Sequence, residues 1–184
     1  MKLRDWMLWV GAALAIAVIV HIGSVSVLPQ IIMSQALARM GHANAIHHGA
    51  RVTADSRGVV RPSPDLLYST CPYDLSKGPL LVRATVPAGT YWSVSAFDEN
   101  TDNFFVRNDR QSRAHTLEFI VTGPVAATVP LPARDEIVLS PTVKGLILFR
   151  TLVSDDADLA RIDAVRRQAT CETVSNALSS NKGG

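Results

Sequence analysis

Cysteine and charged residues are both scarce in this chain of 184 residues. Cys71 and Cys171 are its only thiols, too few and too far apart for a Cys-x-x-Cys metal or redox motif. Charged residues make up 18% of the chain, and 18 lysines and arginines stand against 16 aspartates and glutamates, a net charge of +2. No basic stripe interleaves with aromatic side chains, so the sequence argues against nucleic-acid binding.

The sequence also lacks the patterns that mark familiar catalytic and metal sites. It contains no nucleophile elbow, no Ser-His-Asp order and no helical His-Glu-x-x-His. His42, His47 and His48 form the densest histidine cluster, but no acidic residue lies among them. We interpret this cluster as a solvated or hydrogen-bonding linker rather than a metal site, and we expect no bound metal or cofactor.

The longest uncharged run of the chain lies at its N-terminus. Lys2 and Arg4 precede a stretch from Trp6 to Ile22 that carries no charged residue. With the apolar residues 23–28 included, this run reaches the roughly 20 residues that cross a bilayer as a helix. We therefore predict a membrane anchor within residues 1–28, with its basic start in the cytoplasm and the rest of the chain outside.

A cleaved signal peptide is the alternative to this anchor. Its apolar core would be long for that role, and Ser24-Val25-Ser26 is a poor match to a small-x-small cleavage site. No cysteine follows the run, which argues against a lipoprotein.

Residues 29–50 are predicted to form an amphipathic helix and a linker. Pro29 suits the first turn of a helix but not its interior, so we expect the anchor helix to break or restart there. Apolar residues from Leu28 to Met40 recur at helical spacing, and Gly41 is suited to cap the C-terminus. This helix would either dock against the following domain or lie on the membrane surface, and docking is favoured.

Residues 51–175 have the pattern of a mainly β domain that is closed by a C-terminal helix. Short runs rich in β-branched or aromatic residues are separated by Gly, Pro, Asp and Asn, which favours an antiparallel β-sandwich. In Tyr91–Phe97 the residues Trp92, Val94 and Ala96 share one face. Gly145–Val153 is nearly continuous in apolar residues, as is typical of a central strand buried on both faces. The predicted strands are Leu66–Cys71, Leu80–Val86, Tyr91–Phe97, His115–Val121, Val125–Val129, Glu136–Ser140 and Gly145–Val153.

The C-terminal helix is expected to begin at Ser154-Asp155-Asp156, where a side chain would cap free backbone amides. Residues 176–184 hold Ser, Asn, Lys and Gly and are predicted to be a flexible tail. The apolar face of the helix would hold Leu159, Ile162, Val165 and Ala169, and its arginines Arg161, Arg166 and Arg167 are expected in solvent.

Cys71 and Cys171 both fall in the part of the chain assigned to an oxidising compartment. A disulfide between them would join the end of the first strand to the C-terminal helix. Closing a loop of about 100 residues contributes roughly 4–5 kcal/mol in the chain-entropy model. Two buried free cysteines that act as small hydrophobic residues are the alternative.

The candidate binding residues gather in and around the stretch 67–109. Tyr91 and Trp92 offer aromatic surface, and a polar cluster follows them. Paired carboxylates beside a histidine would suit acid–base chemistry, but Asp and Asn in tight turns usually bond the backbone, so no catalytic residue is assigned. The candidates are Asp65, Tyr68, Tyr91, Trp92, Asp98, Asp102, Asn103 and Asp109.

Three segments of the chain resemble a known family. They are VVRPSPDLLYSTCPYDLSKGP, TYWSVSAFDENTDNFFVRNDRQ and GLILFRTLVSDDADLARIDAVRRQATC. From about His48 to Cys171 the sequence is similar to short membrane-anchored alphaproteobacterial proteins that carry the domain of unknown function numbered 1254. Its last segment is similar to the related family numbered 1214. The resemblance implies a β-sandwich-like domain in the periplasm, held by a single pass through the bacterial inner membrane.

Three functions are compatible with this sequence. The first, which we favour, is a non-catalytic module that binds a partner protein or an envelope glycan or lipid. The second is an accessory subunit of a larger membrane complex, held through small residues of the anchor such as Gly11 and Ala15. The third is an envelope hydrolase that uses Asp and His residues. The expected partners are the lipid bilayer and another membrane or envelope protein, while a small-molecule ligand stays unknown.

Overall fold

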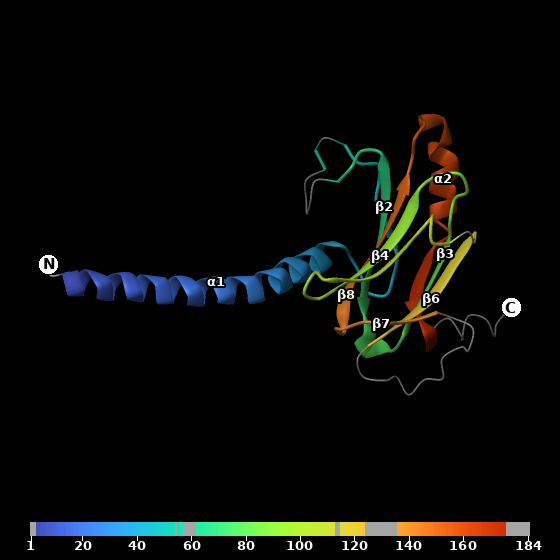
Figure 1. Ribbon diagram of the computed structural model, residues 1–184. Coiled ribbons are helices and arrows are strands. Elements are labelled where there is room, and N and C mark those ends of the chain that lie inside the picture. Colours follow the sequence, from blue (N-terminus) through green and yellow to red (C-terminus); the bar gives the residue numbers. More distant parts are fainter. Residues whose placement is uncertain (1–2, 54, 57–61, 113–114, 124–135, 176–184) are drawn as a thin grey trace.

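A long helix projects from a two-layered β domain (Figure 1). The computed structural model describes residues 3–53, 55–56, 62–112, 115–123 and 136–175. Its helices are α1 (Leu3–Arg39) and α2 (Leu159–Arg166), with 3-10 turns at Leu75–Lys77 and Asp156–Asp158. The strands are β1 (His47–His48), β2 (Leu66–Asp74), β3 (Leu80–Thr85), β4 (Trp92–Asp98), β5 (Asn103–Asn108), β6 (Thr116–Thr122), β7 (Glu136–Leu139), β8 (Lys144–Leu152) and β9 (Thr170–Thr173).

The described strands form two sheets that pack face to face. Sheet A has five strands in the order β1-β2-β8-β4-β5, and sheet B has four in the order β7-β6-β3-β9. Neighbouring strands are antiparallel except β6 and β7, which run parallel. The chain between Thr122 and Glu136 has the length that a parallel connection needs. The predicted sandwich with a helix near each end is confirmed.

The core between the sheets is built from the alternating inward residues of the strands. Trp92, Val94 and Ala96 are 6%, 0% and 0% exposed, so their predicted common face is the buried one. The predicted central strand is β8, which pairs with β2 on one side and β4 on the other. The predicted strand Val125–Val129 and the predicted tail 176–184 lie outside the described residues.

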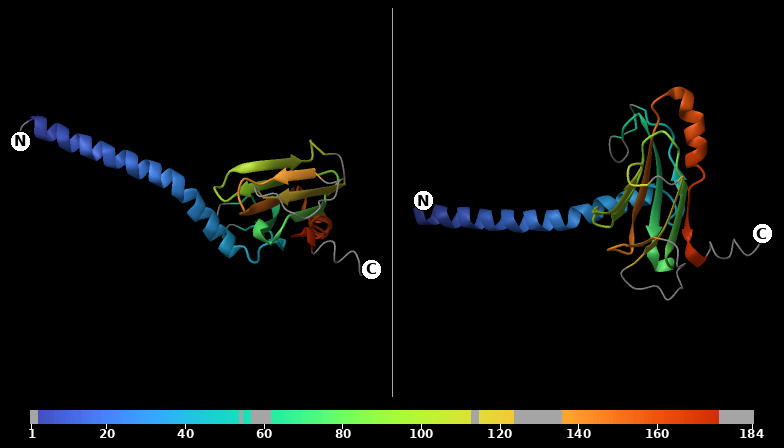
Figure 2. Two further views of the ribbon diagram at one scale, coloured as in Figure 1. Left: turned by 90° about the horizontal axis from the view of Figure 1, so that it is seen from below. Right: turned by 45° about the vertical axis from the view of Figure 1, so that its right-hand side comes forward.

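The prediction that the helix breaks at Pro29 is wrong, because α1 continues through it to Arg39. The left view of Figure 2 shows the helix change direction along its length, the usual response to a proline within a helix. Beyond Pro29, Met33 and Ala36 are buried against the domain, and this packing stabilises the second half of the helix. Gly41 follows the helix with a φ of +97°. Of the two alternatives for this helical segment, the structure shows docking against the domain.

The C-terminal helix is shorter than predicted. The side chain of Asp155 accepts a hydrogen bond from the amide of Ala157 and caps the 3-10 turn Asp156–Asp158. The helix α2 follows this turn without a side-chain cap of its own and ends at Arg166. Ala169 follows the helix, and Cys171 lies in β9, which pairs with β3. The prediction that Arg166 is solvated is also wrong, since this residue is only 6% exposed.

A disulfide joins Cys71 to Cys171 across 100 residues of sequence. It connects β2 of sheet A to β9 of sheet B, rather than a strand to the C-terminal helix as predicted. The bridge therefore fastens the two layers of the sandwich to one another. It indicates an extracytoplasmic domain, and the apolar α1 indicates a membrane anchor or a signal sequence.

Candidate functional site

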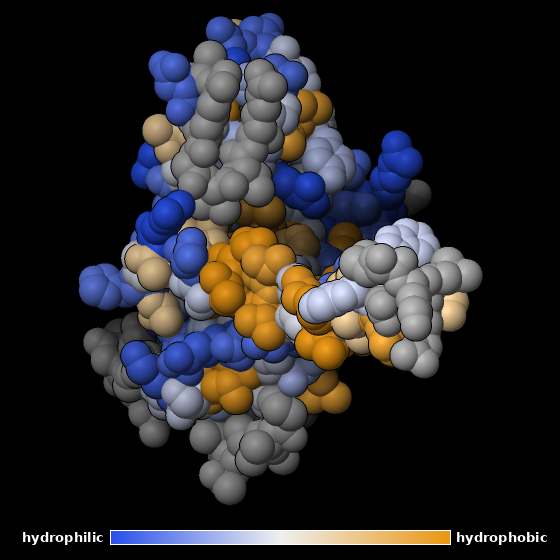
Figure 3. Space-filling model, turned by 90° about the vertical axis from the view of Figure 1, so that its left-hand side faces the viewer, coloured by the Kyte–Doolittle hydropathy of each residue, from blue (hydrophilic) through white to orange (hydrophobic). Residues whose placement is uncertain are grey.

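An apolar groove lies between the C-terminal part of α1 and the outer face of sheet A. It encloses about 650 Å³, within the range of known ligand sites. Figure 3, in which α1 points toward the viewer, shows hydrophobic surface beside the helix on this face of the domain. The groove is lined by residues of α1, β2, β4, β8 and the segment between β1 and β2. Most of them are apolar, among them Ile32, Met33, Ala36, Met40, Phe97, Leu146 and Leu148.

The register of sheet A places the floor of this groove in rows across three strands. Around Leu148 the neighbours are Thr70 on β2 and Ser95 on β4. The adjacent row on one side is apolar, with Leu146 between Pro72 and Phe97; on the other side Arg150 lies between Tyr68 and Ser93. Because side chains alternate between the faces of a strand, these rows face outward together. The groove thus changes from apolar to polar along β8.

Four hydrogen bonds hold α1 and the segment after it over this floor. Gln30 Nε2 donates to Asn100 Oδ1 in the β4–β5 turn, at 2.9 Å. The backbone N–H of Asn44 donates to the carbonyl of Pro72 at 2.7 Å. The Asn44 side chain exchanges two hydrogen bonds with the backbone of Asp74, at 3.0 and 2.8 Å. The helix is therefore fastened on both sides of the groove.

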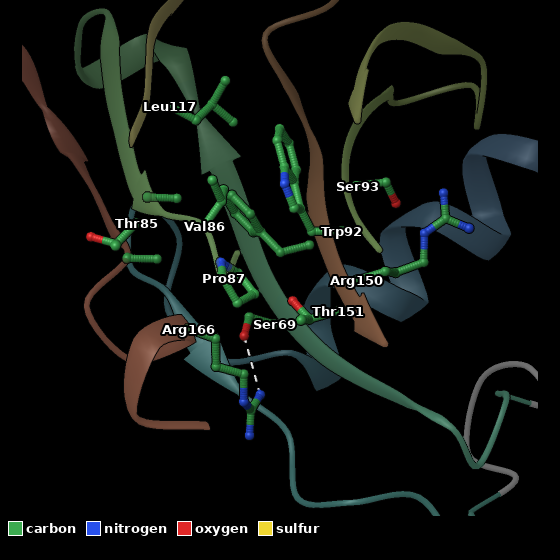
Figure 4. A pocket seen from close by; sticks show the side chains of 13 residues that line it. Ser69, Thr85, Val86, Pro87, Trp92, Ser93, Leu117, Arg150, Thr151 and Arg166 are labelled. Atoms are coloured by element: carbon green, nitrogen blue, oxygen red, sulfur yellow. Dashed lines mark hydrogen bonds between the residues drawn. The ribbon is translucent and has the colours of Figure 1, made fainter. Parts of the chain in front are cut away.

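Arg150 is the cation at the polar end of the groove. One of its terminal nitrogens, Nη2, donates to Ser95 Oγ at 3.3 Å. Its Nε atom and the neighbouring Ser93 Oγ are buried and have no hydrogen-bond partner within the described part of the chain. Figure 4 shows the Arg150 side chain directed away from Trp92 and the sandwich interior, toward the side on which α1 lies.

Arg166 lies outside the groove and bonds the backbone of two residues that line it, Tyr68 and Gly49. Its guanidinium donates to the carbonyls of Tyr68 and Gly49 at 2.8 and 2.7 Å, and to Asp163 at 2.6 Å. It also bonds Ser69 Oγ, as Figure 4 shows. Nothing in the sequence separates Arg166 from its solvated neighbours. Only the position of α2 over β2 brings it inside.

His48 lies next to this arginine, with Nδ1 at 2.8 Å from Ser69 Oγ. Burial lowers the pKa of His48 below its ordinary value, and the guanidiniums of Arg166 and Arg167 lower it further. His47 Nε2 lies 3.0 Å from the carbonyl of His42. The histidine cluster therefore makes hydrogen bonds, and no group of three His, Cys, Asp or Glu residues in the described ranges is placed to hold a metal ion.

The space around Trp92 inside the sandwich is small. The pocket drawn in Figure 4 encloses about 20 Å³, room for one water molecule, between Trp92, Leu117, Phe149 and their neighbours. Trp92 is therefore a core residue whose ring fills the interior. Its predicted part in ligand binding stays a prediction.

A second, more polar hollow of about 460 Å³ lies at the start of β4. Tyr91, Asp109 and His115 line it together. Asp109 Oδ1 is buried there and has no hydrogen-bond partner among the described residues. Of the predicted binding residues, Tyr91, Trp92 and Asp109 line this hollow, whereas Tyr68 lines the groove beside α1.

The remaining predicted residues lie elsewhere. Asp98 is buried, and its Oδ1 accepts hydrogen bonds from the amides of Asn100 and Asp102, so it shapes the β4–β5 turn. Asp102 and Asn103 are exposed beyond this turn. The carbonyl of Asp65 accepts a hydrogen bond from the amide of Val153. Sequence reasoning missed Arg150, the Leu148 row and the residues of α1 that form the groove.

The fold and its groove define a β-sandwich domain that follows an apolar N-terminal helix. Residues 43–173 match the family described as "Protein of unknown function (DUF1254)", and the chain belongs to this family. The resemblance to family 1254 is thereby confirmed; the likeness of the tail to family 1214 stays a prediction. No curated protein matches the chain.

Among solved structures, the chain is similar to the VPA0106 protein from Vibrio parahaemolyticus, with a TM-score of 0.66 and 17% identity. The match covers 85% of this chain and 36% of that protein, so this chain spans about a third of its length. An uncharacterized protein from Burkholderia cenocepacia matches with a TM-score of 0.47 and 13% identity, over 80% of this chain and 39% of that one. The likeness to the Vibrio protein supports the fold.

Proposed function

We propose that this protein is a membrane-anchored, non-catalytic binding module that takes an apolar ligand from the bilayer into the groove between α1 and sheet A. One observation carries the proposal: a groove of about 650 Å³, lined mainly by apolar side chains, lies where an apolar helix joins its domain. Such a groove is the usual form of a small-ligand site.

The length of α1 supports the bilayer as the source of the ligand. Its 37 residues make a helix about 55 Å long, whereas the hydrocarbon core of a bilayer is about 30 Å thick. A helix that starts its span near Trp6 leaves the hydrocarbon well before Met33, which lines the groove. Figure 1 shows the strands of sheet A running across the direction of α1. In this proposal the outer face of sheet A therefore lies toward the membrane.

The roles of the carboxylates favour binding over hydrolysis. Asp98 is engaged by the amides of its own turn. Asp163 is engaged by Arg166 and Arg167, and these bonds lower its pKa below the ordinary value against the opposing effect of burial. Groups that bond the protein itself in this way are structural, and the groove holds no carboxylate among its described lining residues.

A second candidate is an accessory subunit held through α1. The most apolar 18-residue window of the helix has no residue buried against the domain, and Gly11 and Gly23 have open space around them. Small residues on such a surface let a second helix approach closely. Co-purification from native membranes followed by mass spectrometry tests it: a stoichiometric membrane protein supports this candidate, and none contradicts it.

The binding proposal is tested with the full chain in phosphatidylcholine nanodiscs that contain a lipid with a photoreactive acyl chain. We expect cross-links on α1 and also on β8, where Leu146 and Leu148 line the groove. Thr70→Phe should fill the groove beside Leu148 and remove the β8 label, while the α1 label remains.

The matched control is Ile137→Phe, which adds a ring at a half-exposed position on β7, outside the groove. This variant should give the same cross-links on α1 and β8 as the unaltered protein. Cross-links confined to α1 in the unaltered protein would contradict the proposal.

A further inference from the structure

We propose that the groove selects a phospholipid over a lipid without phosphate, with an acyl chain along the apolar floor and the phosphate at Arg150. This inference rests on the proposed function and adds the head-group phosphate to it. Three features of the described residues carry it: the sign of the charge in the groove, the hydrogen-bonding state of Arg150, and the continuity of the groove with α1.

The charge of the groove is of one sign. Among its described lining residues Arg150 is the one charged side chain, and it stands at the end of the apolar row formed by Leu146 and Leu148. An apolar channel that ends at a cation matches a molecule with an apolar chain and an anionic phosphate in its head group. A head group without a phosphate would leave this guanidinium without a counter-charge.

Arg166, which is buried, and Arg150, which is half-buried, differ in what their nitrogens do. Arg166 uses Nε, Nη1 and Nη2, which bond Asp163, Tyr68, Ser69 and Gly49, so it is a structural residue. Arg150 has one long bond, to Ser95, and its buried Nε has no partner among the residues described. Ser93 lies opposite Arg150 in the register of β4 and β8, and its buried Oγ also has no hydrogen-bond partner among the residues described.

A phosphate oxygen suits the guanidinium of Arg150, the charged residue that lines the groove. A guanidinium presents a planar fork of donors that matches phosphate. Such charge-assisted hydrogen bonds are stronger than neutral ones and gain further strength where water is excluded. The polar end of the groove therefore has the chemistry of a phosphate site.

The occupant is assigned to the bilayer because α1 is part of the groove. Ile32, Met33 and Ala36 line it, and the helix is uncharged from Trp6 to these residues. An acyl chain can thus pass from the membrane to Leu148 along a continuous apolar surface. A lipid is anchored by the bilayer at one end, so the groove needs to bind only one of its chains and its head.

The test compares two photoreactive lipids with identical acyl chains, phosphatidylcholine and diacylglycerol, which lacks the phosphate, at equal mole fraction in nanodiscs of the full chain. We expect β8 labelling by phosphatidylcholine to exceed that by diacylglycerol about ten-fold, the ratio that one charge-assisted hydrogen bond supplies. Arg150→Gln should remove this preference and keep the labelling by diacylglycerol.

Arg83→Gln is the control, because it removes the same charge from an exposed position on sheet B. It should keep the preference. Equal labelling by both lipids in the unaltered protein would overturn the inference and leave the proposed function standing. Absence of β8 labelling with either lipid would overturn both, and a preference that survives Arg150→Gln would overturn the role of Arg150.

Discussion

Asn44 and Arg166 show how single polar residues fix the walls of the groove. Asn44 has a φ of +59° and its side chain bonds the backbone of Asp74, which holds the chain after α1 on β2. Arg166 bonds the carbonyls of Gly49 and Tyr68, two residues that line the groove. A groove whose walls are already fixed loses less conformational entropy when a ligand binds.

Gly145 is a residue at which a single methyl group should destabilise the domain. A Cβ at this position would overlap the carbonyl of Phe97 and the ring of Tyr73, neither of which is free to move. The Tyr73 hydroxyl donates to Phe97 O, lies 2.9 Å from Ser140 Oγ, and is buried deeply enough to raise its pKa to about 12. We expect Gly145→Ala to lower the free energy of unfolding by about 1–3 kcal/mol, measured by denaturant titration.

Gly123→Ala serves as the comparison for this substitution. The nearest atoms to a Cβ at Gly123 belong to Leu75 at 3.7 Å, an ordinary contact distance. We expect its unfolding free energy to stay within about 0.5 kcal/mol of the unaltered protein. Equal effects of the two substitutions would show that the close approach at Gly145 is absent.

His48 should make stability depend on pH below neutrality. Its pKa in the folded protein is lower than its ordinary value of about 6.5, so the unfolded chain takes up the proton first as the pH falls. The contribution of the neutral His48 side chain to the free energy of unfolding is complete above the pKa of the unfolded chain. It is lost as the pH decreases through 6.5 toward the pKa of the folded protein. The drop in melting temperature from pH 7.5 to pH 5 should therefore be smaller in His48→Gln than in the unaltered protein.

An identical pH dependence in both proteins would contradict this account of His48. The carboxylates Asp74 and Asp163, whose pKa values are also lowered, lose their contribution in a separate and more acidic range. Measurements that stop at pH 5 therefore report mainly on the imidazole.

At the scale of elements, the two layers of the sandwich depend on the Cys71–Cys171 bridge. It joins β2 to β9, and β9 is a short strand that is otherwise held by its pairing with β3. Removing a native disulfide from a small domain typically costs about 2–5 kcal/mol. We expect Cys71→Ser and Cys171→Ser to lower the melting temperature by similar amounts, since each removes the same cross-link.

Calorimetry of the two single variants and of the double variant checks this prediction. The melting temperature of the double variant should be close to that of either single variant, because all three lack the same cross-link. The double variant differs further only in the loss of a second buried sulfur. Clearly unequal effects, or a reactive thiol in the native protein, would count against the bridge.

The elements that sequence patterns predicted are those with a clear period. β6 alternates as expected, with Leu117, Phe119 and Val121 in the core, and β8 is the central strand of its sheet. Helix ends were less predictable. Pro29 is tolerated because the helix beyond it packs on the domain. The apolar pattern of α2 extends past the end of the helix toward β9, but the residues of β9 form a strand because their pairing with β3 outweighs local helix preference.

The groove could not be predicted, because its residues are distant in sequence. Met33, Thr70 and Leu148 meet only after β2 and β8 pair in one register and α1 docks across them. Sequence reasoning looked instead to aromatic and acidic residues, and the structure places Trp92 in the core and Asp98 in a turn. Arginines give no local signal of burial, so neither Arg150 nor Arg166 could be separated from exposed cations.

For the whole molecule, the proposal amounts to an orientation: α1 stays in the bilayer and the outer face of sheet A lies against the membrane surface. The right view of Figure 2 shows α1 projecting from the same side of the sandwich. Sheet B then faces the aqueous compartment. The same orientation would bring Leu148 and Arg150 to the depth of the lipid head groups, which the two binding proposals require.

Spin labels in the reconstituted full chain measure this orientation directly. Both native cysteines are disulfide-bonded in the structure, so a single label can be attached to Thr70→Cys in the groove or to Arg83→Cys on sheet B. The account predicts that the label at position 70 collides more often with lipid-soluble oxygen than with a water-soluble nickel chelate, and that the label at position 83 shows the reverse. Equal, water-like collision rates at both positions would contradict it.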